Sequence, residues 1–274
     1  MAQLHFWGVR GSIPTILDTH TKYGANTPCL SLEFDDTHII LDAGTGLYKC
    51  GNYLLNHPKK IIFLMSHYHW DHIQGLPYFY PLYRYNFNIS ICSAHLHNIS
   101  SILDDLFDGV KFPMSFNQLS SPPKLLSESE FTGFLQDYNC NSLENHHPGT
   151  SFSYSFRVGD KKVVYCSDHE LRPFSDNDNV KHVNFCKDSD VLVLDAHFNT
   201  KDHPERRGWG HSFLEDALEL AHRANVKQLY LFHHDPRKSD FILDRNIKKA
   251  TDWIKKHNAS FVVHNATEGQ RLSL

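Results

Sequence analysis

The architecture of this chain can be argued outward from one stretch, Met65-Ser66-His67-Tyr68-His69-Trp70-Asp71-His72. The stretch follows an apolar run, residues 61–65, that is short, uncharged and rich in branched and aromatic residues, which is typical of a buried strand. Three imidazoles this close together would repel one another once protonated, and with the neighbouring carboxylate they would be costly to desolvate unless a cation lay among them. The stretch therefore predicts a metal site at the end of a strand.

The spacing of these residues divides them between two ions. His67 and His69 can converge on one ion, while the adjacent Asp71 and His72 can face a second ion close by. A lone histidine is usually a surface residue or a satisfied core residue, but four ligand-type residues directly after a strand favour metal binding. The pattern HxHxDH thus predicts half of a two-metal site.

The run from His67 to His72 resembles the signature of the metallo-β-lactamase-fold hydrolases, and further motifs place the likeness closest to their ribonuclease Z-like phosphodiesterase branch. The resemblance implies an α/β fold, an αββα sandwich of two mixed β-sheets flanked by helices, with the ligands clustered at strand ends. We expect a single domain over residues 1–274. Glycines and prolines interrupt residues 108–130, which predicts a loop or a flap over the site.

Composition narrows the class of substrate and the compartment. Apolar residues make up 41% of the chain and aromatic residues 13%, which is ample for a core, and the formal net charge of −4 argues against a broad basic face for nucleic acid. The basic arm with which ribonuclease Z-type enzymes hold transfer RNA is not visible either, so a small molecule fits better. Six scattered cysteines are typical of reduced thiols in a cytoplasmic protein, and we expect neither secretion nor membrane spanning. The oligomeric state stays open, with a homodimer as one option.

Two motifs precede the histidine stretch. A strand at residues 4–7 leads into a glycine-punctuated turn that resembles the start of the ribonuclease Z branch; there Arg10 could face the site and hold an anion, or could only pair with a nearby carboxylate. A hairpin of residues 30–34 and 38–41 then delivers Asp42, followed by Gly44 and Gly46. In the family such an aspartate orients a metal-ligating histidine; the alternative is a helix N-cap.

The resemblance also assigns the remaining ligands. His147, within His146-His147-Pro148-Gly149-Thr150, matches the family's His-Pro-Gly pattern better than His146, and Gly149 and Thr150 could offer backbone N–H groups to an anion. Asp168, at the end of a strand, resembles the bridging aspartate, whose two oxygens can bind both ions. His233, the first residue after a strand, would complete the second ion, with His234 as the alternative. The implied ligands are His67, His69 and His147 for one ion, Asp71, His72 and His233 for the other, and Asp168 between them.

Two further residues resemble the acid and histidine motifs of ribonuclease Z-like phosphodiesterases. Asp195 ends the apolar run 191–194, and His211 precedes a helical stripe that Ser212 and Glu215 would open as a capping box. In the family such a pair is thought to help protonate the leaving oxygen; the alternative makes Asp195 a cap and His211 a surface residue. The residues expected to act in catalysis are Asp71, Asp195 and His211.

The implied ligand set of five imidazoles and two carboxylates, without a thiolate, suits two Zn²⁺ ions and does not exclude manganese or iron. Two such ions lower the pKa of a bridging water and clamp the oxygens of a displacement at phosphorus. We therefore expect a dinuclear metal-dependent hydrolase, a phosphodiesterase for a small or cyclic phosphodiester such as a cyclic nucleotide. The alternatives are a thioesterase or lactonase of the glyoxalase II type, and a non-catalytic metal-binding or regulatory protein.

Overall fold

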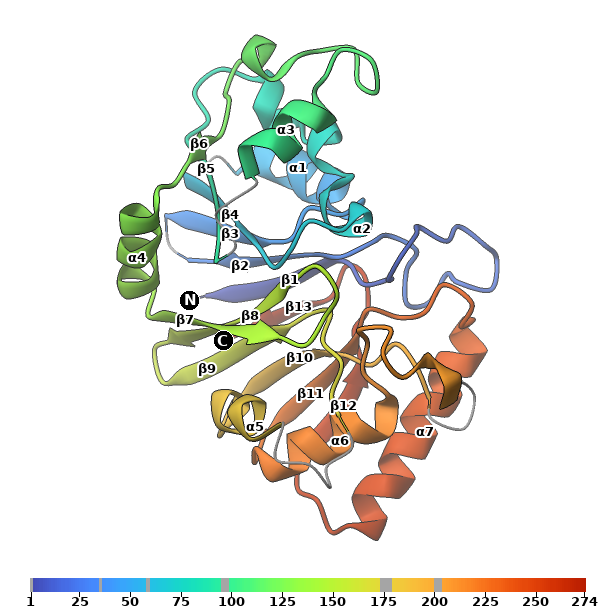
Figure 1. The fold of residues 1–274 in the computed structure, drawn as a ribbon. Helices are drawn as coiled ribbons and strands as arrows, with labels where there is room; N and C mark the ends of the chain where they lie inside the picture. The colour runs from blue at the N-terminus through green and yellow to red at the C-terminus, as the bar shows by residue number, and fades with distance from the viewer. Residues whose placement is uncertain (1, 35, 58–59, 95–98, 173–178, 200–203) are drawn as a thin grey trace.

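Two β-sheets lie face to face, with helices on the outer side of each (Figure 1). The structure is a computed structural model that describes residues 2–34, 36–57, 60–94, 99–172, 179–199 and 204–274. Within these residues the first sheet has the strand order β13 (Arg271–Ser273), β1 (Gln3–Gly8), β2 (Cys29–Glu33), β3 (Thr37–Leu41), β4 (Lys60–Met65), β5 (Ile89–Ser93), β6 (Lys124–Leu125). The second has the order β12 (Val262–Asn265), β11 (Gln228–Phe232), β10 (Val191–Asp195), β9 (Lys161–Cys166), β8 (Ser151–Val158), β7 (Cys140–Asn145).

Both sheets are mixed, as predicted. In the first, β3 to β6 run parallel while β13 to β3 pair antiparallel. In the second, β9 to β12 run parallel while β7 to β9 pair antiparallel. The predicted αββα sandwich is therefore confirmed, and the carboxyl ends of the parallel strands deliver the loops that carry the predicted ligands.

Alternate residues of the parallel strands serve two different cores, which explains why these strands read as continuous apolar runs. In β4, Ile62 and Leu64 face the core between the sheets, while Ile61 and Phe63 face the helices of the first sheet. The outer layers comprise α1 (Leu47–Leu55), α2 (Trp70–Ile73) and α3 (Ile99–Leu106) on the first sheet, and α5 (Val180–Cys186), α6 (Leu214–Arg223) and α7 (Asp240–Lys256) on the second. Helix α4 (Glu128–Asp137) closes one end of the central core with Phe131 and Phe134.

Residues 108–130, expected as a loop or flap, contain regular structure. They form a 3-10 turn at Phe116–Gln118, the edge strand β6 and the start of α4. Phe112 packs against Tyr78 and Phe107, on the outer core of the first sheet. Among the described residues, no helix is long and apolar enough to cross a membrane.

Candidate metal centre and its flanking histidine

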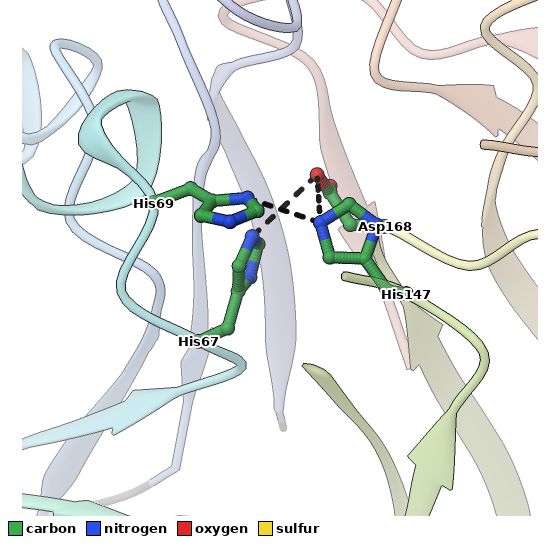
Figure 2. A group of neighbouring side chains, drawn as sticks. All are labelled: His67, His69, His147 and Asp168. Atoms are coloured by element: carbon green, nitrogen blue, oxygen red, sulfur yellow. Dashed lines mark hydrogen bonds and ion pairs between the residues drawn. The ribbon is translucent and has the colours of Figure 1, made fainter. Parts of the chain in front are cut away.

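Four of the predicted ligands converge from three loops on one point (Figure 2). The Oδ2 atom of Asp168 lies 3.6 Å from Nε2 of His67 and 3.7 Å from Nε2 of His147. Nε2 of His147 is in turn 3.0 Å from Nδ1 of His69. We refer to His67, His69 and His147 as the first group; its ring nitrogens surround a space beside one oxygen of Asp168.

The other predicted ligands gather beside the second oxygen of Asp168. Its Oδ1 atom is 3.2 Å from Nε2 of both His72 and His233. Oδ2 of Asp71 is 3.1 Å from Nε2 of His233 and 3.5 Å from Nε2 of His72. We refer to Asp71, His72 and His233 as the second group; all three are buried. The two oxygens of Asp168 therefore face two separate ligand groups, as a bridging carboxylate requires.

Asp42, at the end of β3, orients histidines of both groups. Its carboxylate accepts hydrogen bonds from Nδ1 of His72 (2.8 Å) and from the hydroxyl of Ser66 (2.7 Å), and that hydroxyl accepts from Nδ1 of His67 (3.0 Å). The Nδ1–H of each ring is thereby engaged, which leaves the lone pair on Nε2. Both Nε2 atoms are buried and have no hydrogen-bond partner among the described residues. A helix cap does not describe Asp42, because α1 begins at Leu47 with Gly46 as N-cap.

Buried nitrogens without a hydrogen-bond partner beside buried carboxylates fit a divalent cation, because a metal uses those lone pairs. Burial opposes the charged form of Asp168, but the surrounding imidazoles of His233 and His72 outweigh it and hold its pKa well below its usual range. Burial also lowers the pKa of His67 well below its usual range. For His72 burial acts in the same direction, yet Asp168 and Asp71 outweigh it and raise its pKa well above the ordinary value.

Two glycines allow the backbone to lie against ligand rings, and the sequence reasoning did not single them out. A Cβ added to Gly11 would stand 2.4 Å from the His233 ring, and one added to Gly210 would stand 2.5 Å from Nδ1 of His147. Gly210 also has φ +85°, and its carbonyl accepts a 2.7 Å hydrogen bond from Nδ1 of His147. Any larger residue at either position would push a candidate ligand out of place.

His211 and Asp195 lie beside both groups. Nδ1 of His211 donates a 2.8 Å hydrogen bond to Asp195, which is fully buried. The ring centroid of His211 is 4.9 Å from that of His233 and 5.3 Å from that of His147. Burial disfavours the charged ring, but Asp195 outweighs it and raises the pKa of His211 to about 9. His211 thus holds a proton at neutral pH at the edge of the candidate centre.

The loop that carries His211 is fixed by Glu170. The Glu170 carboxylate accepts hydrogen bonds from the amides of Gly208 (2.7 and 2.9 Å) and Gly210 (2.7 Å). Ser212 donates its hydroxyl to the carbonyl of His169. The predicted capping box of Ser212 and Glu215 is therefore wrong: α6 begins at Leu214 without a side-chain cap, because the Ser212 hydroxyl is used by the neighbouring loop.

His197 is a further member of this cluster that we did not predict. It groups with Asp195, His211 and His233, and its ring stacks on His211 with centroids 4.7 Å apart. Nδ1 of His197 donates a 2.8 Å hydrogen bond to the carbonyl of His233. The signal available in the sequence was its position two residues after Asp195, at the end of a buried strand.

Two of the predicted anion-binding residues do not face the centre. Arg10 is fully buried and donates to the carbonyls of Gly24 (2.8 Å) and Lys238 (2.7 Å). Its guanidinium also lies 3.6 Å from the carboxylate of Asp240, so of the two interpretations of Arg10 the structure agrees with pairing to a carboxylate. The amide of Thr150 donates to the carbonyl of His147 and is not available to an anion. Gly149, with φ +80°, does lie against the His69 ring.

The structure also separates the two pairs of adjacent histidines. The His146 ring accepts a hydrogen bond from Arg172 at 2.6 Å, outside the centre, whereas His147 lies inside it. His234 donates through Nε2 to the carbonyl of Ala266 (3.0 Å), while His233, with φ +56°, turns into the second group.

Comparison with known proteins agrees with this architecture. Residues 37–234 match the model of the beta-lactamase superfamily domain. Ribonuclease Z of Picrophilus torridus is 24% identical over 97% of each chain, and ribonuclease Z of Thermoplasma acidophilum is 22% identical over 86% of this chain and 87% of its own.

Solved structures show the same fold over the whole chain. The metallo-β-lactamase fold protein YhfI from Bacillus subtilis superposes with a TM-score of 0.71 and 17% identity, covering all of both chains. A diphosphatase of the PhnP family gives a TM-score of 0.64 at 17% identity, covering 100% of this chain and 98% of its own. Human short-form tRNase Z gives 0.63 at 16% identity, covering 99% and 98%.

Proposed function

The chain belongs to the beta-lactamase superfamily, and we propose that within it the protein is a dinuclear metal-dependent hydrolase that cleaves phosphodiesters. One observation carries the proposal: the two oxygens of Asp168 face two separate ligand groups, with His211, hydrogen-bonded to Asp195, at their edge. Hydrolysis of a diester with a poor leaving group needs both a place to activate water and a proton donor.

The residues available for two ions fit that chemistry. His67, His69 and His147 would hold one ion, Asp71, His72 and His233 the other, and Asp168 would be shared. The donor set is that of zinc, and it also suits manganese or iron. When bound, two divalent ions lower the pKa of a water molecule and stabilise negative charge on phosphoryl oxygens. Asp71 is placed for this role by the amide of Ser12, which donates to its Oδ2 at 2.7 Å.

His211 would act as the general acid. Because its Nδ1–H is bonded to Asp195, the second ring nitrogen, Nε2, is the one that can meet a leaving oxygen and give up a proton. Asp195 holds the ring in this orientation and stabilises its charged form, and Asp195 is itself held by the amide of His197 at 2.9 Å. This arrangement favours phosphodiester hydrolysis over thioester hydrolysis, in which a thiolate can leave with less help from an acid.

The preferred substrate is a small or cyclic phosphodiester, such as a cyclic nucleotide. Net charge −4 supports a small substrate. RNA is the second candidate, because relatives that match almost the whole chain are named ribonuclease Z. A phosphate anhydride would use the same groups, in line with the name of the PhnP-family diphosphatase.

The test combines metal analysis with a substrate panel. Protein from metal-replete medium should hold close to two ions and should hydrolyse phosphodiesters but neither thioesters nor lactones. The His147→Ala protein should lose metal and activity, whereas the His146→Ala protein, altered at the neighbouring ring outside the centre, should keep both. Good turnover of thioesters or lactones, with no phosphodiester cleaved by the metal-loaded protein, would overturn the proposal.

A further inference from the structure

A pocket of about 280 Å³ lies between the loop after β11 and the N-terminal half of α7. Its charged and polar lining comprises Asp235, Arg237, Lys238, Arg245, Asn246 and Lys249. We call it the basic pocket. Four cationic side chains therefore meet around one small cavity in a chain whose formal net charge is −4. Such a concentration of one sign of charge attracts a ligand of the opposite sign.

Internal ion pairing uses only part of this charge. Arg237 is bound to both oxygens of Asp235, through Nε at 3.0 and 3.2 Å and through Nη2 at 2.5 Å, so these two groups neutralise each other. Arg245 makes no hydrogen bond or ion pair with any residue that the structure describes. Arg245 therefore gives the pocket a guanidinium group whose N–H donors no described residue uses.

The basic pocket is connected to the candidate centre through His197. Nζ of Lys238 donates a 2.6 Å hydrogen bond to the carbonyl of His197, and Nε2 of His197 is 3.8 Å from Asp235. The His197 ring also stacks on His211. The pocket therefore lies next to His197, on the side of the candidate centre that carries the proposed general acid, His211.

The size and chemistry of the pocket restrict its ligand. Its volume falls just below the range of sites that bind drug-sized molecules, so it takes a small group and not a folded chain. Guanidinium and ammonium groups around a small polar cavity are the usual partners of phosphoryl oxygens. Asn246 adds an amide whose oxygen is taken by Asn199 at 3.1 Å, which leaves its nitrogen as a donor.

We propose that the basic pocket binds a phosphoryl group, carried either by the leaving portion of a substrate or by free phosphate. The first source rests on the proposed function, because it makes the substrate a diester with a second phosphate on its leaving portion. The second source does not depend on catalysis. Both sources share the ligand chemistry, and the experiment separates them.

The binding test uses inorganic phosphate and isothermal titration calorimetry on the metal-loaded full chain. Wild-type protein should bind phosphate at a site that persists after the metals are removed by a chelator, because the basic pocket contains none of the candidate ligands. Arg245→Glu should weaken this site by about 10-fold or more, the usual effect of losing a charge-assisted hydrogen bond. Lys248→Glu, the same change of charge on an exposed position of the same helix outside the pocket, should leave it unchanged.

Kinetics then identify the source of the phosphoryl group. If the substrate carries the phosphoryl group, Arg245→Glu should raise KM by about 10-fold for a diester whose leaving portion bears a phosphate, and kcat should be retained. For the same diester without that phosphate, KM should be unchanged. If free phosphate is the ligand, both KM values should match the wild type while phosphate binding is still weakened. The proposal is overturned if phosphate binding by the metal-free protein is absent, or is equal in the wild-type and Arg245→Glu proteins. Either result is independent of whether the protein hydrolyses any diester.

Discussion

The two ligand groups around Asp168 differ in burial and in charge. The second group is buried and brings its own carboxylate, Asp71, so a cation there would meet two carboxylates. The first group consists of three histidines and shares only Asp168, and His69 is exposed to solvent. Because attraction between opposite charges is stronger in a buried environment, the second group should hold its ion more tightly. The first group should exchange its ion and admit substrate.

The largest effect should come from Asp168, the residue that both groups share. The Asp168→Ala protein should lose both ions, because each group loses the carboxylate oxygen of Asp168 that lies beside it. Phosphodiester hydrolysis should then fall by on the order of 10⁴-fold or more, as when a central member of a catalytic unit is removed. Metal content by elemental analysis, measured beside activity, checks this. Retention of two ions would mean that the groups are independent sites and that Asp168 does not join them.

The next effect concerns His211, which lies outside both groups. The His211→Ala protein should keep both ions and lose about 10²–10⁴-fold in turnover of a diester with an alkoxide leaving group, because the proton donor is gone. A nitrophenyl diester, whose leaving group departs without a proton, should be affected much less. Equal losses on the two substrates would remove His211 from the acid role.

The pH profile gives an independent check on the same residue. With its pKa raised to about 9, His211 is protonated below that pH and loses its proton above it. Turnover of the alkoxide diester by the wild-type protein should therefore decline as the pH rises past about 9. The His211→Ala protein should not show this decline, and the nitrophenyl diester should show it weakly or not at all in either protein.

A smaller effect should distinguish the groups through Asp42, which contacts His72 directly and His67 only through Ser66. The Asp42→Asn protein should lose about 10- to 100-fold in metal affinity, as is usual when a residue that orients a ligand is replaced, and mainly at the second group. Competition with a chelator would measure the two affinities. If the first group were weakened equally, the contact through Ser66 would be as strong as the direct one.

The smallest effect should come from Glu170, which acts on the first group through Gly210 and His147. The Glu170→Gln protein should bind the first ion about 10-fold more weakly, the low end of the range for residues that orient ligands, because Glu170 acts through an intervening loop. Glu144→Gln is the matched control, since Glu144 lies exposed on β7. Similar chelator titrations of the two variants would show that Glu170 has no such role.

Much of this architecture could be predicted from sequence because the ligands follow apolar runs. A strand whose side chains alternate between two cores is apolar at every position, so it can be recognised in the sequence as a run such as residues 61–65. Because such strands are parallel, their carboxyl ends lie at the same edge of the sheet. Which of two adjacent histidines enters the site depends instead on local backbone conformation. At His233 the backbone has a left-handed conformation, and the sequence of the two adjacent histidines does not indicate which of them adopts it.

Arg10 and Glu170 show a second limit. The carbonyls that accept from Arg10 belong to Gly24 and Lys238, and the amides that donate to Glu170 belong to Gly208 and Gly210. These partners are distant in the sequence and are backbone groups, so no pattern of side chains indicates them. A buried charged residue can be predicted to have partners, but their identity depends on the tertiary fold.

The division of the ligands between the two halves of the sandwich has a consequence for folding. His67, His69, Asp71 and His72 follow β4 of the first sheet, while His147, Asp168 and His233 follow β7, β9 and β11 of the second. Tyr165 of β9 also reaches across to Asp42, at 2.7 Å. An ion bound to ligands from both sheets binds only when the halves are docked, so it adds about 2.7 kcal/mol to the unfolding free energy at a free concentration 100 times its Kd. Metal supply would thereby set how tightly the two halves are held together.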